Sequence, residues 1–242
     1  MIEGSDRIEL APGVVFRGDC LHDVVRGTDV PLTVSARTVL RPGATIAEIA
    51  ASLACLGARD PERDATAFAT QLNGLLLANV RAPCGARLLR RVRALRHGVA
   101  LRAPPRRIAV NSPWTFVAAL APSAAAVVVV LLPLVFLGGP WTIAAAAAAG
   151  TGIVVHEAAH AVALHGVPRA LVLDGLKPSI LHPPLGARRT FATAVAGPLA
   201  PTLVALAVAL AWRSAAPAVV PLAAHVLGLT VIAPDGRTAC GL

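Results

Sequence analysis

Three chemically versatile side chains stand together near the end of a long apolar stretch: His156, Glu157 and His160, in the sequence HEAAH. No Asp, Glu, Lys or Arg occurs from Ile108 to Val155. Ionisable side chains are costly in hydrocarbon, so a cluster of them there indicates a functional site. Histidines four residues apart share one face of a helix and can bind one Zn²⁺, while the neighbouring glutamate can reach a water molecule without being a ligand. The spacing predicts a zinc metallohydrolase site on a helix.

A simpler interpretation of the same residues is that His156 and His160 form hydrogen bonds between transmembrane helices and bind no metal. This alternative gives no reason for a carboxylate to be placed beside them. Burying Glu157 in an apolar environment without a function would only cost free energy. The metal site is therefore the favoured interpretation.

The composition predicts an α-helical membrane protein. The chain has 242 residues, of which 56% are hydrophobic, and a mean hydropathy of +0.69, which is too apolar for an ordinary soluble protein. The excess of apolar residues lies mainly in the second half, where four stretches are long enough to cross a bilayer. These expected spans are Trp114 to Leu137, Trp141 to His165, Thr190 to Trp212 and Ser214 to Pro234.

Positive charge is concentrated just before the first span. Residues 81–107 contain nine arginines and no acidic residue, and the loop 166–189 is also basic. Arginines beside transmembrane helices mark the cytoplasmic side, so we expect a multi-pass protein of the cell (inner) membrane with its N-terminal part in the cytosol. The apolar positions of residues 87–96 fall on one helical face that can lie on lipid headgroups. Binding to nucleic acid is disfavoured because the basic segment lacks aromatic side chains for base stacking.

A catalytic zinc ion needs a third protein ligand besides the two histidines. After His160 the only carboxylates are Asp174 and Asp235. Asp235 is favoured because it ends an apolar span on the expected cytosolic side, and Gly236 lets the backbone approach closely. Asp174 remains the alternative, although its sequence Leu-Asp-Gly is typical of a turn.

Three motifs in order resemble the site-2 protease family of intramembrane zinc metalloproteases. HEAAH lies on one expected span, AGPLA (residues 196–200) on the next, and PDGR (residues 234–237) closes another. The resemblance covers residues 108–242. It implies His156, His160 and Asp235 as zinc ligands and Glu157 as the catalytic base, and it places Gly197 and Pro198 in a substrate-binding segment.

The chain also departs from the family pattern at positions thought to hold substrate backbone. Pro201 stands where the family usually has Asn after AGPLA, and the Asn and Pro that usually precede the Asp-Gly pair are not both present. His225 lies in that segment instead. It can replace the missing Asn as a polar contact, or it can form a hydrogen bond between spans.

The N-terminal region, residues 1–80, has the pattern of a small α+β domain. Thr45 and Glu48 form a capping box that predicts a helix to about Leu56, and Asp60-Pro61 predicts the start of a second helix that continues to about Asn79. Short strands are expected before them, at Val14–Phe16, Asp23–Val25 and Asp29–Val34. This order resembles the PqqD-like peptide-recognition domains, which are winged-helix folds that bind the leader of a precursor peptide as an added strand. The resemblance implies a groove between residues 29–34 and 65–76.

The two resemblances together predict three parts: a PqqD-like domain (1–80), an Arg-rich juxtamembrane linker (81–107) and an intramembrane metalloprotease domain (108–242). The expected function is cleavage of a peptide bond during maturation of a ribosomally synthesised, post-translationally modified peptide precursor. One alternative is regulated cleavage of a single-span membrane protein. Another is a catalytically silent membrane adaptor that presents a peptide. A metal transporter is disfavoured because only one span carries paired ligands.

Overall fold

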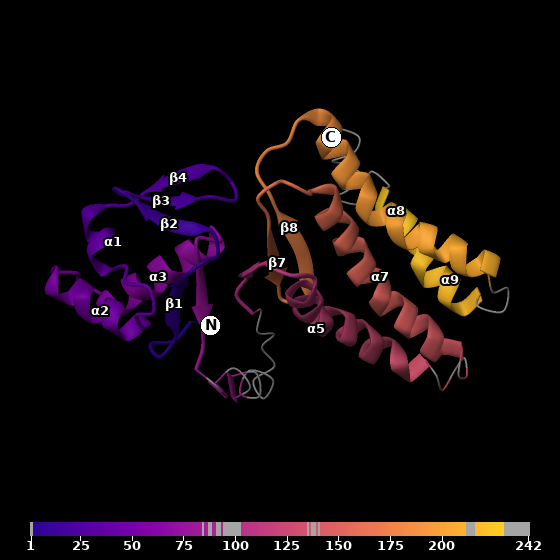
Figure 1. Cartoon of the computed structure of the whole chain (residues 1–242). Coiled ribbons are helices and arrows are strands. Elements are labelled where there is room, and N and C mark those ends of the chain that lie inside the picture. Colours follow the sequence, from indigo (N-terminus) through magenta and orange to yellow (C-terminus); the bar gives the residue numbers. More distant parts are fainter. Residues whose placement is uncertain are drawn as a thin grey trace. The chain divides into compact units, whose positions relative to one another are not determined.

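The chain forms two compact units in a computed structural model (Figure 1). The first comprises Met1–Ala109 with Val172–Gly175, and the second comprises Val110–Leu171 with Leu176–Leu242. The structure describes residues 2–83, 85–86, 89–90, 93, 103–134, 136, 139, 141–211 and 216–229. The first unit thus continues beyond residue 80, where the sequence analysis placed its end.

The first unit has the small α+β composition expected from the sequence. Its strands form an antiparallel pair of β1 with β5 and an antiparallel sheet in the order β2-β3-β4. Three helices follow β4 in the chain. The strands are β1 Arg7–Leu10, β2 Val14–Arg17, β3 Cys20–Asp23, β4 Thr28–Pro31 and β5 Ala78–Arg81, and the helices are α1 Val34–Val39, α2 Ile46–Cys55 and α3 Pro61–Gly74.

Local capping signals place two of these helices where the sequence predicts them. The Thr45 side chain accepts a hydrogen bond from the Glu48 N–H, and the Glu48 carboxylate accepts one from the Thr45 N–H, which completes the capping box of α2. The Asp60 carboxylate likewise accepts from the N–H of Arg63 at the start of α3. The hydrophobic core below these helices includes Ile8 and Leu21, neither of which is exposed, and each such side chain contributes about 1.5–3 kcal/mol by its burial.

Helix α3 ends at Gly74, five residues before the expected end at Asn79. Leu76 adopts a left-handed conformation with φ of 58°, and the Leu77 N–H donates to the carbonyl of Leu72 in a Schellman-type cap. The chain therefore turns and forms β5. Its partner β1 was not predicted, because the four-residue sequence RIEL carries too little pattern to identify a strand by itself.

The other expected strands are displaced by a few residues. The strand predicted at Asp23–Val25 is wrong beyond its first residue: β3 ends at Asp23, and Val24 and Val25 lie in a turn where the Asp23 carboxylate accepts from the Val25 N–H. The strand predicted to reach Val34 is β4, which ends at Pro31. Thr33 then caps α1 by accepting a hydrogen bond from the Ala36 N–H, so Val34 is helical.

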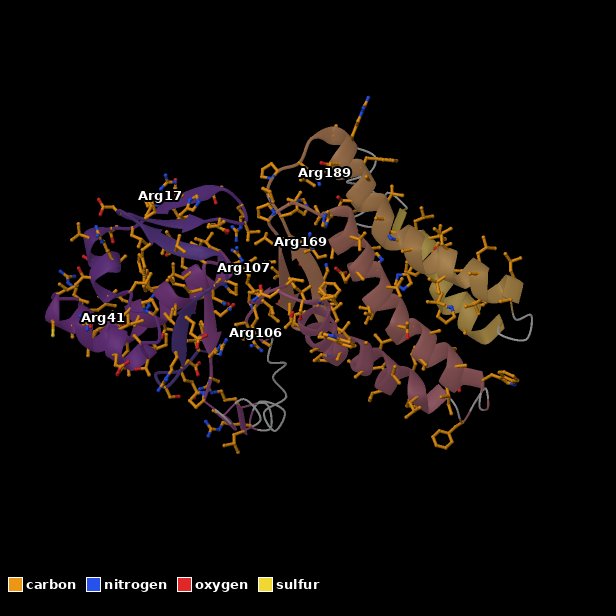
Figure 2. All side chains as sticks on the ribbon, in the orientation of Figure 1. Arg17, Arg41, Arg106, Arg107, Arg169 and Arg189 are labelled. Carbon is orange, nitrogen blue, oxygen red and sulfur yellow. The ribbon has the colours of Figure 1, made fainter. Side chains whose placement is uncertain are left out.

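Arg107, labelled in Figure 2, is an internal part of the first unit. Its guanidinium donates to both carboxylate oxygens of Asp23 at 2.8 Å, and both side chains are 0% exposed. The Asn79 side chain bonds both the N–H and the carbonyl of Arg107 at 2.8 Å, and Asn73 donates to the Pro105 carbonyl. The end of the segment predicted as a linker is thus bound into the first unit.

The pKa of Asp23 reflects this arrangement. Burial raises the pKa of the carboxyl, but hydrogen bonds from the Arg107 side chain and the Arg26 backbone, together with the charges of both arginines, lower it further than burial raises it. The net pKa lies below the ordinary value. Arg90, from the same basic segment, pairs with Glu3 and Asp6, and its described contacts are also internal.

The second unit contains three helices that are long and apolar enough to cross a membrane: α5 Pro113–Leu131, α7 Trp141–Ala163 and α8 Ala187–Ala211. They coincide with the first three expected spans. Large apolar side chains point outward from them, for example Val130 (74% exposed) and Leu210 (77% exposed). Such surfaces suit hydrocarbon rather than water.

The fourth expected span, Ser214 to Pro234, lies partly outside the described residues, and its described part, residues 216–229, forms shorter elements. Helix α9 covers Ala216–Ala223 and continues as the 3₁₀ helix η3, Ala224–Leu229. Over the part of the chain that the structure describes there are therefore three candidate spans rather than four. The basic region 87–96 that was expected on lipid headgroups lies largely outside the described residues.

Helix α7 is the central element of the second unit and contacts α5, α8 and α9 (Figure 1). Small residues permit this close packing. A Cβ atom at Gly150 would lie 3.0 Å from the carbonyl oxygen of Ala124 in α5. The ionisable side chains of α7, His156, Glu157 and His160, all occur in its C-terminal half.

The region 166–189, expected as a basic loop, contains a β-hairpin of β7, Ala170–Asp174, and β8, Lys177–Leu181. These strands join β6, Arg106–Ala109, in a sheet with the order β6-β7-β8. Arg169 and Arg189, labelled in Figure 2, donate to the carbonyls of Leu164 and His165 just beyond α7. Cations near these free carbonyls stabilise the C-terminal end of the helix.

Candidate metal centre

The three residues of the predicted metal site lie together on the C-terminal part of α7. His156, Glu157 and His160 line one cavity of about 410 Å³ in the second unit. Glu157 is 8% exposed and His160 is 9% exposed, so both are buried on a helix that is otherwise mostly apolar. The Nε2 atoms of the two histidines are 3.2 Å apart.

This distance fits a shared metal ion. Two imidazole nitrogens at about 2.0–2.1 Å from a tetrahedral zinc ion are separated by about 3.3 Å. The Nδ1 atom of His160 is 2.7 Å from the carbonyl oxygen of Thr193 in α8, so Nδ1 carries the proton and donates it there. The lone pair of His160 is therefore on Nε2, the atom that faces His156. A backbone carbonyl that fixes the tautomer in this way is a common partner of metal-binding histidines.

Gly197 from the AGPLA motif lacks a side chain and so leaves room for the His160 ring. A Cβ atom at position 197 would lie 2.2 Å from His160 Nε2, which is closer than any real contact of this kind. The glycine thus contacts the predicted ligand directly. Pro198 is buried within α8 and is not among the described residues that line the cavity. The predicted role of these two residues in substrate binding stays a prediction.

The third ligand is not identified by the structure. Asp235 lies outside the described residues, as do Gly236 and the rest of the PDGR motif. Among the residues that are described, no group of three His, Cys, Asp or Glu side chains is arranged to hold a metal ion. Asp174 ends β7 and lines another cavity, of about 420 Å³, together with Asn73 and Pro105 of the first unit. The other interpretation of Asp174 from the sequence, as a turn residue, agrees with the hairpin turn at Gly175.

Several residues of the cavity were not anticipated. The hairpin strand β8 and the segment after it contribute Lys177, Ser179 and His182 to the lining, and α8 contributes Thr190 and Thr193. The hydroxyl of Thr193 is buried and forms no hydrogen bond with any described residue. The role of Thr193 as acceptor for His160 involves its backbone carbonyl, which every residue type carries, so no sequence signal could have revealed it.

His225, in η3, contacts the outer side of the histidine pair. Its Nδ1 atom is 3.3 Å from Nδ1 of His156, and the two ring centroids are 5.3 Å apart. A Cβ atom at Gly152 of α7 would lie 2.6 Å from His225 Nε2, so the ring packs closely on the helix at that glycine. Of the two sequence-based options for His225, the structure supports a hydrogen bond between helices, and its partner is a predicted metal ligand.

The motifs that carry the resemblance to site-2 proteases thus have different outcomes. HEAAH lies in α7 and faces the cavity, and AGPLA lies in α8 with its glycine against His160. The last motif, PDGR, lies beyond the described residues. Comparisons of the chain with protein-family models, with curated proteins and with solved structures give no match.

Proposed function

We propose that this chain is an intramembrane zinc metalloendopeptidase of the site-2 protease type. The single observation that carries the proposal is the 3.2 Å separation of His156 Nε2 and His160 Nε2, with Glu157 buried beside them in one cavity. An apolar helix that held these three groups without a function would lose stability and gain nothing.

The proposed ligands are His156 and His160 through their Nε2 atoms, with Asp235 as the third. Imidazole nitrogens with a carboxylate form a common set for catalytic zinc, which leaves a position for water or substrate. When bound, zinc supplies Lewis acidity that polarises the scissile carbonyl and lowers the pKa of water. Thr193 contributes by fixing the tautomer of His160.

Glu157 is the proposed general base and then the general acid. Its carboxylate accepts a proton from the attacking water, whose oxygen forms the new bond to the carbonyl carbon. The C–N bond of the peptide then breaks, and Glu157 returns the proton to the leaving amine nitrogen. The products are one carboxylate and one amine, and Glu157 is regenerated. Because Glu157 is only 8% exposed, its charge interacts strongly with the reacting groups.

The proposed substrate is a precursor peptide that the first unit captures. In the sheet β2-β3-β4 of this unit, β4 is an edge strand, and an edge can accept an extended peptide as an added strand. A peptide bound to one part of the chain has a raised effective concentration at the metal site of another part. Lys177 and Ser179 of β8, which line the catalytic cavity, are available to contact the peptide there.

The proposed location is the inner membrane, with the first unit in the cytosol. Three apolar helices support the membrane part of this proposal. Positive charge supports the orientation, but two arginines before the first span, Arg90 and Arg107, form internal ion pairs. Their charge is thus partly neutralised, so the sidedness depends on the remaining arginines and on the basic region 166–189.

The test is co-expression of the full chain with candidate short peptides encoded beside it, followed by mass spectrometry of the peptides. Wild-type protein is expected to produce two fragments, and Glu157→Gln is expected to leave the precursor intact. An adaptor that only presents peptides would give the same masses with both proteins. Identical masses would therefore reject proteolysis for those candidates.

A second comparison identifies the third ligand. In purified full-length protein, Asp235→Asn is expected to lower zinc content and Asp174→Asn to leave it unchanged, because Asp174 lines a cavity of the first unit. The two substitutions make the same chemical change and are matched controls for each other. Loss of zinc with Asp174→Asn alone would reassign the ligand.

A further inference from the structure

We propose that His225 is a positioning residue: it holds His156 in the tautomer and orientation that present Nε2 to the metal. This inference rests on the proposed function, because it assumes that His156 and His160 bind one metal ion. It assigns His225 a role other than contact with substrate. The contact that carries it is the 3.3 Å separation between the Nδ1 atoms of His225 and His156.

The two ring nitrogens of His156 face different partners. Its Nε2 atom is 3.2 Å from Nε2 of His160, and its Nδ1 atom is 3.3 Å from Nδ1 of His225. These nitrogens are separated by one carbon and point away from each other, so only one of them can face the shared metal position. The other nitrogen is then available for a hydrogen bond.

The hydrogen-bond direction follows from the need for a lone pair. A neutral imidazole carries its proton on one nitrogen, so a lone pair on His156 Nε2 requires the proton on Nδ1. His156 Nδ1–H then donates to the lone pair on His225 Nδ1, and His225 carries its own proton on Nε2. His160 shows the same arrangement, since its Nδ1–H donates to the Thr193 carbonyl at 2.7 Å. Both proposed ligands thus have an oriented tautomer.

The position of His225 argues against its being a ligand itself. His225 contacts the Nδ1 atom of His156, whereas the other ring nitrogen of His156, Nε2, faces His160. A metal between the two Nδ1 atoms is the competing arrangement, since 3.3 Å also suits a pair of ligands. In that arrangement His156 would carry its proton on Nε2 and donate it to His160 Nε2, so only one histidine of the HEAAH motif would bind the metal. The positioning role uses all three histidines.

Gly152 provides the space that His225 occupies. It precedes His156 by one helical turn on α7, and a Cβ atom there would lie 2.6 Å from His225 Nε2 and 3.2 Å from Cδ2. An alanine at this position would push the ring away from α7. The proposal therefore predicts that Gly152→Ala weakens metal binding, although Gly152 itself cannot contact a metal ion.

The test measures metal affinity and coordination in the full-length protein purified in detergent, without reference to proteolysis. Zinc affinity is determined by competition with a chromophoric chelator, and the visible absorption of the Co²⁺-loaded protein reports ligand geometry. The variants are His225→Leu, His225→Gln and Gly152→Ala. His165→Leu is the matched control, because His165 follows the end of α7 but lines a different cavity.

His225→Leu is expected to lower zinc affinity about 10–100-fold, which is typical for loss of a group that orients a ligand. His225→Gln is expected to recover part of this loss, since its amide oxygen can accept from His156 Nδ1–H. Gly152→Ala is expected to fall between wild type and His225→Leu. The Co²⁺ spectrum should keep its shape in all of them, because the ligands do not change.

Two results would overturn the proposal. Wild-type affinity in His225→Leu would show that the contact has no role in metal binding. A loss as large as that of His156→Ala, with no recovery by Gln and an altered Co²⁺ spectrum, would make His225 a ligand. Thermal unfolding of the metal-free proteins identifies any variant that fails to fold. If His225→Leu fails to fold, the zinc affinity of Gly152→Ala tests the proposal instead. If wild type binds metal but does not cleave peptides, the proposed function fails while the inference about His225 stands.

Discussion

The two units of the chain bury polar side chains for different purposes. In the first unit these residues are far apart in sequence and each is paired with another part of the unit: Asp6, Asp23, Asn73, Asn79 and Arg107. In the second unit the buried polar residues are Ser123, Glu157, His160 and Thr193, and three of the four line one cavity. The described buried polar groups are thus spread over the fold of the first unit, whereas those of the second unit are gathered mainly at one cavity.

In the first unit the polar contacts join segments that are distant in the sequence. The Asp23–Arg107 ion pair joins residues 84 positions apart, and Asn79 bonds the Arg107 backbone on both sides. Among the residues described there, the buried carboxylates of Asp6 and Asp23 each face an arginine, so removing that arginine leaves a buried charge that is less well compensated. Such groups act on stability.

In the second unit the polar groups are concentrated where the helices leave a cavity. Around them, contacts are made by small residues, such as Gly150 against α5 and Gly197 against His160. Under the proposed function, a carboxylate and an imidazole pair held this way reduce stability and are kept for chemistry. Substitutions at the cavity of the second unit should therefore lower activity, and substitutions at the ion pairs of the first unit should lower stability.

The largest effect is expected from Glu157→Gln. Removing a general base costs about 10²–10⁴-fold in rate, so peptide cleavage should become undetectable. The thermal unfolding midpoint should stay equal to that of wild type or rise, because a buried charge is removed while the shape of the side chain is kept. A variant that is inactive and also strongly destabilised would place Glu157 with the structural polar groups of the first unit.

Arg107→Leu should have the opposite signature. It leaves the buried Asp23 carboxylate with only the partly exposed Arg26 as a charged partner, and breaking a buried ion pair costs about 3–5 kcal/mol of unfolding free energy. Hydrogen exchange of the full chain should show loss of protection in β3 and β5, while zinc content is unchanged.

Two controls sharpen this prediction. Arg37→Leu removes an exposed ion pair with Asp19 and should change stability by less than about 1 kcal/mol. The double variant Asp23→Leu with Arg107→Leu should recover much of the loss, because apolar side chains often replace a buried pair well. Equal protection in Arg107→Leu and wild type would mean that the pair does not stabilise the unit.

The sequence predicts what depends on neighbouring residues and misses what depends on distant ones. The capping box of Thr45 and Glu48 and the spacing of His156 and His160 are local patterns, and the structure confirms the helices that both require. The zinc itself stays a prediction. By contrast, Arg107 was predicted only to flank the membrane, because its partner Asp23 is 84 positions away and any acidic residue would have matched equally well.

The polar neighbours of the predicted ligands show the same limit. The carbonyl of Thr193 has no sequence signal, and His225 was visible only as an isolated histidine in an apolar run. Helix ends were also displaced where a turn depends on backbone conformation, as at Leu76 after α3. The residues of the HEAAH motif were thus predictable from the sequence. The groups that orient them could be identified only from the arrangement of α7, α8 and η3.

Gly197→Ala is expected to have an intermediate effect on the metal site. The added Cβ would lie 2.2 Å from His160 Nε2, so the imidazole must move and zinc affinity should fall about 10–100-fold. Gly186→Ala is the matched control, because nothing lies within 4 Å of its added Cβ. Competition with a chelator measures both variants. Equal affinities would show that His160 has room to move without losing the metal.

The smallest effect concerns pH. The lowered pKa of Asp23 means that its ionised form is favoured in the folded state, so its contribution is complete above the ordinary value of 3.8 and is lost as pH falls through the lower folded pKa. The difference in unfolding midpoint between wild type and Asp23→Asn should therefore be constant near neutral pH and shrink under acid conditions. Asp19→Asn, at an exposed pair, should track wild type throughout. If the advantage over Asp23→Asn instead widened in acid, the pair would not depend on an ionised carboxylate, and the contrast between the two units would lose its electrostatic basis.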